Sequence, residues 1–200
     1  MAFKAIGFDY GGVLAGPTSD EFNRKISAIL GISLDDFRTV FYKYNKLINE
    51  EGVGVDAFWG KLLNEIGKPE KQESVKKFLS EFPEDRVNED VVTLSRKLKV
   101  SGFKTGILSN NSAERYEKIK ANFRSYFDEI VVSAIVGKSK PDPEIFKLFF
   151  EKMGVAAEEM IFVDDTPRNI VAVGALGSTG ILFTDYSSLV KSLEDLGIKV

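Results

Sequence analysis

Acidic, hydroxyl and amide side chains follow three short apolar stretches of this sequence. Asp9 comes directly after the first stretch, Ser109 and Asn110 end the second, and Asp164 and Asp165 end a later one. A single Asp after an apolar run is most often a turn or cap residue. Two adjacent carboxylates at the end of a buried strand are different, because they repel each other and resist desolvation unless a cation is present.

The composition limits the chemistry that these residues can do. The 200-residue chain contains no His and no Cys, which excludes imidazole bases, thiolate metal sites, disulfides and Ser-His-Asp or Cys-His triads. Catalysis would therefore depend on Asp, Glu, Lys, Ser, Thr or Tyr, or on a metal held by oxygen. The 27 basic and 30 acidic residues are scattered and give a net charge of −3, so we expect binding neither to nucleic acid nor to an anionic membrane surface.

The elements that would position these residues can be predicted from hydrophobic periodicity. Short apolar runs, typical of strands buried on both faces, cover residues 3–9, 103–109, 129–135, 160–164 and 179–183. Helix start signals lie between the later runs, at Asn88, Ser112, Asp142 and Thr166. This alternation predicts an α/β fold with a Rossmann-like, doubly wound parallel sheet. The polar groups would then converge beyond the carboxyl ends of the strands.

The interval between the first strand and the rest has a different pattern. It contains amphipathic helix-period segments with no convincing strand, and these segments cover residues 19–30, 33–50, 55–67 and 69–82. We therefore expect an all-helical cap domain over residues 17–84, inserted into a core domain made of residues 1–16 and 85–200.

Four segments of the chain carry a family resemblance. They are FDYGGVL, which contains Asp9; ILSNN, which contains Ser109; GKSKPDPEIF, which contains Lys140; and FVDDTPRNI, which contains the acidic pair. In this order they resemble the four motifs of the haloacid dehalogenase-like (HAD) hydrolase superfamily. The resemblance covers essentially the whole chain, because this superfamily carries a helical cap after its first motif. The phosphatase-type subfamily with Asp-x-Gly in the first motif is the most similar.

The resemblance implies phosphoryl transfer through an aspartyl-phosphate, with Asp9 attacking phosphorus. It also implies that Ser109 and the backbone N–H of Asn110 hydrogen-bond the phosphoryl oxygens, while Lys140 neutralises the nucleophile and the phosphate. Lys138 is the less favoured alternative, since Lys140 directly precedes the Pro.

A divalent cation is the expected cofactor. Three carboxylates and a phosphate monoester against one lysine would leave a large excess of negative charge, and an all-oxygen ligand set favours Mg²⁺. The resemblance implies that Mg²⁺ is held by Asp9, the Gly11 carbonyl and Asp165. Asp164 is either a further ligand or a partner of the ligands.

Gly11 departs from the usual motif. Most phosphatases of the superfamily carry a second Asp two residues after the nucleophile, where it protonates the leaving alkoxide and later deprotonates the attacking water. Such a general acid/base typically contributes a factor of about 10² to 10⁴ to the rate. We therefore expect activity to be concentrated on good leaving groups, such as anomeric sugar-1-phosphates, acyl phosphates and aryl phosphates.

Three other functions compete with this interpretation. A 2-haloacid dehalogenase also lacks the second Asp, but it needs no metal, does not pair two acids in its fourth motif, and carries Tyr two places after the nucleophile, whereas Tyr10 is one place after Asp9. A signalling receiver domain would have its acidic pair on the first strand. A phosphate-binding or scaffold protein without turnover is the remaining alternative, and Gly11 is its main support.

The sequence gives less information about the substrate, the cellular location and the oligomeric state of the protein. We expect a small phosphorylated metabolite, a sugar phosphate being one candidate, with Asn110, Gly12, Arg24 and Tyr42 as substrate-binding residues. The chain has neither an apolar stretch of the roughly 18 to 20 residues that span a bilayer nor a signal-peptide pattern. We therefore expect a soluble, cytoplasmic protein without a membrane partner; the sequence leaves its oligomeric state open.

Overall fold

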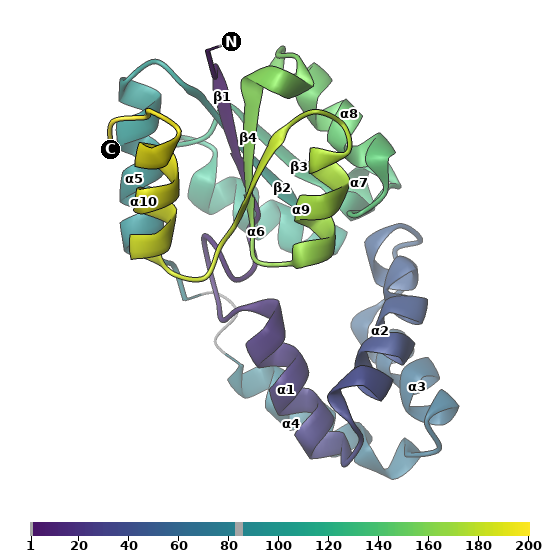
Figure 1. Cartoon of the computed structure of the whole chain (residues 1–200). Helices are drawn as coiled ribbons and strands as arrows, with labels where there is room; N and C mark the ends of the chain where they lie inside the picture. Colours follow the sequence, from purple (N-terminus) through teal and green to yellow (C-terminus); the bar gives the residue numbers. More distant parts are fainter. Residues whose placement is uncertain (1, 83–85) are drawn as a thin grey trace.

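A computed structural model describes residues 2–82 and 86–200. Its centre is a parallel sheet of five strands in the order β3-β2-β1-β4-β5 (Figure 1). The strands are β1 (Ala5–Phe8), β2 (Lys104–Ser109), β3 (Glu129–Val132), β4 (Met160–Asp164) and β5 (Thr179–Leu182). The expected doubly wound α/β fold is thus confirmed.

Helices cover both faces of the sheet, which explains why its strands are continuously apolar. The side chains of Ile6 and Phe8 pack in one cluster with three helices: α5 (Glu89–Val100), α6 (Ala113–Phe123) and α10 (Tyr186–Asp195). Ala5 points to the opposite face and packs in a cluster with α8 (Pro143–Met153) and α9 (Pro167–Gly174). The buried sheet is therefore a rigid base for the residues that follow its strands.

The third strand is shorter than the apolar run predicts. The run covers residues 129–135, but β3 ends at Val132 and residues Ser133–Val136 form the short helix α7, which ends at Gly137 with φ 66°. The reason is a competing set of hydrogen bonds: Ser133 Oγ accepts from the Asn111 backbone N–H at 3.0 Å and donates to the Asn111 carbonyl at 3.2 Å.

A separate helical layer lies beyond the carboxyl ends of the strands (Figure 1). Its helices, called the cap below, are α1 (Ser19–Leu30), α2 (Leu34–Asn49), α3 (Val55–Glu65) and α4 (Gln72–Glu81), with a 3-10 turn at Pro69–Lys71 before α4. They pack on a cluster of their own that includes Phe37, Phe58 and Trp59. The predicted boundary between residues 84 and 85 falls outside the described residues.

The start of each of the first two cap helices follows from local capping. Thr18 and Ser33 are N-caps whose side chains accept hydrogen bonds from Glu21 N and Asp36 N, respectively. Gly31 ends α1 in the left-handed region at φ 63°, where glycine is favoured because it has no Cβ. Within residues 2–82 and 86–200, none of the helices has the length and apolar character needed to span a membrane.

Candidate active site

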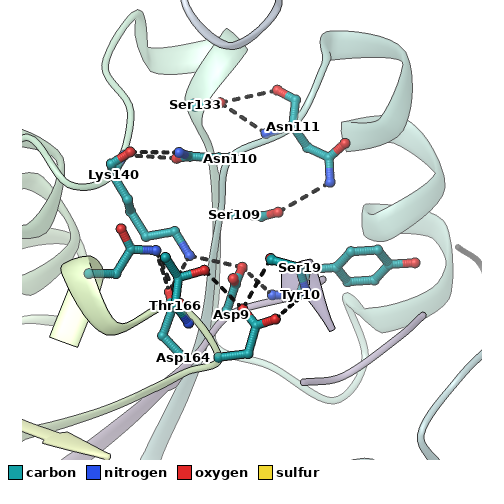
Figure 2. A network of polar contacts seen from close by, with 12 residues as sticks. Asp9, Tyr10, Ser19, Ser109, Asn110, Asn111, Ser133, Lys140, Asp164 and Thr166 are labelled. Carbon is teal, nitrogen blue, oxygen red and sulfur yellow. Dashed lines mark hydrogen bonds and ion pairs between the residues drawn. The ribbon is translucent and has the colours of Figure 1, made fainter. Parts of the chain in front are cut away.

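The acidic residues that follow β1 and β4 meet at the carboxyl edge of the sheet. β1 pairs with β4 in parallel, with Phe8 opposite Val163, so the next residues along both strands are neighbours. Oxygen atoms of Asp9, Asp164 and Asp165 lie within 4.8 Å of one another. Lys140 lies among them: its Nζ is 2.9 Å from Asp9 Oδ1 and 2.7 Å from Asp164 Oδ2 (Figure 2).

The backbone of Lys140 is fastened to the end of β2 by one side chain. Asn110 Nδ2 donates to the Lys140 carbonyl at 2.7 Å, and the Lys140 backbone N–H donates to Asn110 Oδ1 at 2.8 Å (Figure 2). This paired bond fixes the loop between α7 and α8, and the Lys140 side chain is 1% exposed. The structure therefore brings Lys140, and not Lys138, to the carboxylates.

Asp164 is fully buried, and both of its oxygens are occupied by donors. Oδ1 accepts from the Thr166 backbone N–H at 2.8 Å, while Asn169 Nδ2 lies 3.0 Å from each oxygen and Lys140 Nζ donates to Oδ2. Thr166 and Asn169 belong to the start of α9, where backbone N–H groups have no partner inside the helix, and Lys140 comes from the loop between α7 and α8. Asp164 thus holds Lys140 in place and has little capacity left for a metal.

Asp9 has one oxygen engaged and one available. Its Oδ1 accepts from the Tyr10 backbone N–H at 2.7 Å and from Lys140 Nζ at 2.9 Å. Among the described residues, no group donates a hydrogen bond to Oδ2. The carboxylate is therefore held by one oxygen, which leaves the other for a ligand or for a reaction.

Burial and charge both act on these groups. Burial raises the pKa of Asp9 well above its usual value, Lys140 opposes that effect, and Asp164 and Asp165 add to it. Burial also raises the pKa of Asp165, against the hydrogen bond from Ser19 N. For Lys140, burial alone would lower the pKa, but the charges of Asp164 and Asp9 outweigh it and raise the pKa. The lysine therefore stays charged, and the surroundings of Asp9 and Asp165 favour neutralisation of their negative charge by a proton or a cation.

Asp165 links this centre to the cap. Its Oδ2 accepts from the Ser19 backbone N–H at 2.5 Å, and its Oδ1 accepts from Thr166 Oγ1 at 3.1 Å and from Ser19 Oγ at 3.3 Å. Ser19 is the first residue of α1, so the carboxylate lies at the positive end of that helix.

The end of β2 contributes a hydroxyl next to the same edge. Ser109 is 1% exposed, and its Oγ accepts from Asn111 Nδ2 at 3.3 Å. Asn111 is in turn held through its backbone by Ser133. The hydroxyl of Ser109 therefore has a fixed neighbour on one side (Figure 2).

The two glycines after Asp9 differ in their surroundings. No described atom lies within 4 Å of the place where a Cβ on Gly11 would be, and its φ is outside the left-handed region. Gly12 has φ 75°, and a Cβ there would collide with the Asp165 carboxylate and with the Thr18 backbone. Position 11 can therefore accept a side chain, whereas position 12 requires glycine.

A cavity of about 260 Å³ lies between this centre and the cap. Asp9, Gly11 and Lys140 line it from the core, together with Asn110. Tyr42, one of the expected substrate-binding residues, lines it from the cap. Arg24 does not: its Nε donates to Asp20 at 2.6 Å and its side chain is 67% exposed.

Several residues of the site were not singled out from the sequence. Arg168 stacks its guanidinium on the Tyr42 ring at 3.5 Å, which joins α9 to α2, and burial lowers the pKa of Arg168. Asn169 and Thr166 surround Asp164, and the Ser19 backbone binds Asp165. Thr166-Pro167 signals the start of α9 in the sequence, and this signal could have indicated Thr166, Arg168 and Asn169. Residues in the first turn of a helix face the strand end that precedes it.

The donor set fits a hard divalent cation. Asp9 and Asp165 offer carboxylate oxygens within a short distance of each other, and no imidazole or thiolate is present in the chain. Their raised pKa values show that the site favours added positive charge. Carboxylate and carbonyl oxygens are the ligands that Mg²⁺ prefers. Asp164 fits this role less well because its oxygens are already occupied.

Comparison with known proteins gives a family for this arrangement. A family model described as haloacid dehalogenase-like hydrolase matches residues 3–177. A sesquiterpene phosphatase of Aspergillus oryzae is 29% identical over 197 residues, which are 97% of this chain and 96% of that protein. The bifunctional epoxide hydrolase 2 of Sus scrofa is 33% identical over 117 residues, which are 56% of this chain and only 21% of that much longer protein.

A solved structure has the same fold. It is a HAD-family enzyme of Bacteroides thetaiotaomicron in complex with magnesium and inorganic phosphate, with a TM-score of 0.60, 22% identity and coverage of 94% of this chain and 99% of that chain. At this identity the likeness shows the common fold alone.

Proposed function

Because the chain belongs to the haloacid dehalogenase-like hydrolase family, we propose that it is a Mg²⁺-dependent phosphatase that hydrolyses phosphate monoesters of small metabolites. A phosphatase relative of nearly equal length supports this activity. A similar fold that was solved with magnesium and inorganic phosphate supports the metal and the phosphoryl site.

The observation that carries the proposal is the asymmetry of Asp9. One oxygen is held by Lys140 and by the Tyr10 backbone, and the other faces no donor among the described residues. A carboxylate fixed in this way is suited to nucleophilic attack, because its orientation is set before the substrate binds. A merely structural Asp would have both oxygens satisfied, as Asp164 has.

In the proposed reaction Asp9 attacks phosphorus. A bond forms between the free carboxylate oxygen and phosphorus, the bond from phosphorus to the alcohol oxygen breaks, and the alcohol leaves as an anion that takes a proton from solvent. Water then attacks the phosphorus of the aspartyl-phosphate, the bond from phosphorus to Asp9 breaks, and the water gives up a proton to solvent, which releases inorganic phosphate and restores the Asp9 carboxylate. Lys140 balances the charge of nucleophile and phosphate throughout, and Ser109 and the Asn110 backbone N–H bind the phosphoryl oxygens.

Asp9, the Gly11 carbonyl and Asp165 would hold Mg²⁺, which when bound offsets the charge of the carboxylates and the phosphate and orients the phosphoryl group. Asp164 acts through Lys140, since its contacts are with that lysine and with α9.

Gly11 leaves the leaving group without a carboxylic acid to protonate it. The proposed substrates are therefore monoesters whose alcohols leave readily as anions. A phenol ionises near pKa 10, as Tyr does, and needs far less help from an acid than an aliphatic alcohol does.

The test is a phosphate-release panel with and without Mg²⁺. It contains an aryl phosphate, acetyl phosphate, sugar-1-phosphates and sugar-6-phosphates, with Asp9→Asn as the inactive control and the exposed Arg24→Ala as the matched surface control. We expect release that requires Mg²⁺, favours the first three classes and is lost in Asp9→Asn. A folded protein that binds phosphate and Mg²⁺ but releases nothing would instead support the non-catalytic alternative, and halide release from a 2-haloacid would support the dehalogenase.

A further inference from the structure

A second chamber adjoins the cavity at Asp9. This second chamber, of about 330 Å³, shares Phe22, Phe41, Asn45, Asn49, Asn111 and Arg115 with the first. The remaining lining comes from the cap and from α6, and none of it belongs to the acidic centre. A molecule whose phosphate lies at Asp9 can therefore extend past these shared residues, away from the carboxylates.

Apart from Asn45 and Asn49, the cap side of the second chamber is apolar. Beyond the shared residues its wall consists of Ile48, Val55, Phe58, Trp59 and Leu79. Phe22 and Phe41 stand where the two chambers join, with ring centroids 6.0 Å apart. This wall offers no hydrogen-bond partner for a hydroxyl except the indole N–H of Trp59, whose residue is 5% exposed.

The opposite side carries positive charge. Three charged residues of α6 line the same chamber, Glu114, Arg115 and Lys118, and their formal charges sum to +1. Cations near an apolar wall attract the face of an aromatic ring more than they attract a saturated chain, because the ring carries a negative quadrupole on its face. The chamber therefore suits a flat aromatic group between apolar and cationic sides.

The limited volume of the first cavity favours placement of the substrate's alcohol part in the second chamber. The first cavity of about 260 Å³ must contain the phosphoryl group, the cation and its waters, each water taking about 30 Å³. Polar amides surround that region, since Asn23, Asn45 and Asn49 line it. What remains of the substrate reaches the second chamber, which exceeds the roughly 150 Å³ of an engineered cavity that binds benzene.

We propose that the second chamber binds the aromatic leaving group of an aryl phosphate monoester. This inference rests on the proposed function and narrows it. Two independent features support it: Gly11 supplies no acid, so a leaving group of phenol-like acidity is favoured, and the chamber lining favours an aromatic body over a polyhydroxylated one. Sugar hydroxyls directed at the apolar part of the wall would lose their hydrogen bonds to water without gaining a partner, which disfavours a sugar in this chamber.

The experiment compares aryl phosphates of nearly equal leaving-group acidity but different size. Phenyl phosphate and 2-naphthyl phosphate differ by one fused ring, and glucose-1-phosphate serves as the polar comparison. We expect kcat/KM to rise at least about tenfold from phenyl to 2-naphthyl, because several more carbons enter an apolar site. Glucose-1-phosphate should be the poorest of the three.

Val55→Asp tests whether the aryl group binds in the second chamber. Val55 lines the second chamber, is 45% exposed and begins α3, where a carboxylate is compatible with the helix N-terminus. The variant should reduce the 2-naphthyl to phenyl ratio toward one. The control is Val100→Asp. Val100 is the last residue of α5 and is 90% exposed, so this variant should leave the 2-naphthyl to phenyl ratio of kcat/KM unchanged.

A binding measurement separates the two proposals. Calorimetry with phenylphosphonate and 2-naphthylphosphonate requires no turnover, and we expect the naphthyl compound to bind about tenfold more tightly in the presence of Mg²⁺. If phenyl phosphate is hydrolysed but neither naphthyl compound is preferred, the chamber inference is wrong and the phosphatase stands. If glucose-1-phosphate is preferred, the alcohol lies instead in the cavity lined by Asp20, Arg38 and Arg168. If the naphthylphosphonate is preferred without any hydrolysis, the phosphatase proposal is wrong.

Discussion

At the scale of single residues, the site depends on how each carboxylate is satisfied. Asp9, Asp164 and Asp165 are chemically identical, yet their surroundings separate them: Asp164 has every lone pair directed at a donor, Asp9 has one free oxygen, and Asp165 is bonded to the cap. Their positions at the ends of predicted parallel strands indicate that the three carboxylates lie close together at one edge of the sheet. These positions do not indicate which oxygen is free, because that depends on Tyr10, Thr166 and other groups whose contacts form only in the fold.

Gly11→Asp is the residue-scale prediction. Nothing described lies within 4 Å of its Cβ position, so the new carboxyl group fits beside the leaving group. We expect turnover of alkyl phosphates to rise by up to about 10²-fold, with a smaller gain for aryl phosphates, because only poor leaving groups need an acid. Rates measured across leaving groups of graded acidity check this expectation.

Gly12→Asp is the matched control for that substitution. It adds the same group one residue later, where φ is 75° and a Cβ collides with Asp165. It should lower thermal stability and activity together. An equal response of the two variants would show that the gain at position 11 does not come from proton donation.

At the scale of elements, capping and strand-edge contacts decide where each element ends. Asp128 is one such contact: it accepts from the Thr105 backbone N–H at 2.8 Å at the start of β2, and it lies 2.8 Å from Lys99 Nζ at the end of α5. Burial opposes ionisation of Asp128, but the hydrogen bonds from Lys99 and Thr105 outweigh it and lower its pKa.

Asp128→Asn gives a pH-dependent prediction with a defined sign. A carboxyl group whose pKa is lowered in the folded state stabilises the fold at pH values above its unfolded pKa of about 3.9. This stabilisation is lost as pH falls through the folded pKa. The difference in urea midpoint between wild type and Asp128→Asn should therefore be constant from pH 7 to about 5 and shrink below about 4. A difference that is independent of pH would contradict the assignment.

The helices and strands also show how much secondary structure can be predicted from hydrophobic periodicity alone. The five strands, the cap helices and the helices α5, α6, α8 and α9 correspond to predicted segments, because buried parallel strands and amphipathic helices have distinct repeats. The end of β3 was misplaced, since Ser133 prefers partners on Asn111. Helix α10 was not predicted, although Asp185 caps it through Ser188 N at 2.8 Å.

At the scale of the whole molecule, side chains of the core and the cap contact each other around the site. Ser19 bonds Asp165, Tyr42 stacks on Arg168, and Glu50 accepts a hydrogen bond from Ser139, next to Lys140. The prediction that Tyr42 contacts substrate did not include its position, because the register of a helix over a distant edge of the sheet depends on packing.

Arg168→Ala tests the contribution of one cap contact. Loss of a cation–π contact of about 0.5 to 2 kcal/mol should raise KM by roughly 2- to 30-fold, because the cap closes less favourably over the substrate. Arg96→Ala is the control: Arg96 stacks on Tyr126 at 3.6 Å with nearly the same geometry, but within the core. It should reduce stability without changing KM. A raised KM in both variants would mean that general destabilisation, and not the cap contact, is responsible.

The way in which the chain leaves and re-enters the core has a consequence for its evolution. The Gly16 backbone N–H donates to the Arg86 carbonyl at 2.8 Å, and the Asn88 N–H donates to the Leu14 carbonyl at 2.9 Å, so both ends of the long excursion are already side by side. A short turn between them would close the chain at little entropic cost. We therefore expect the cap to be a replaceable module: its loss or exchange would change the lining of the cavity, while the connectivity of the sheet and the placement of Asp9 would stay as they are.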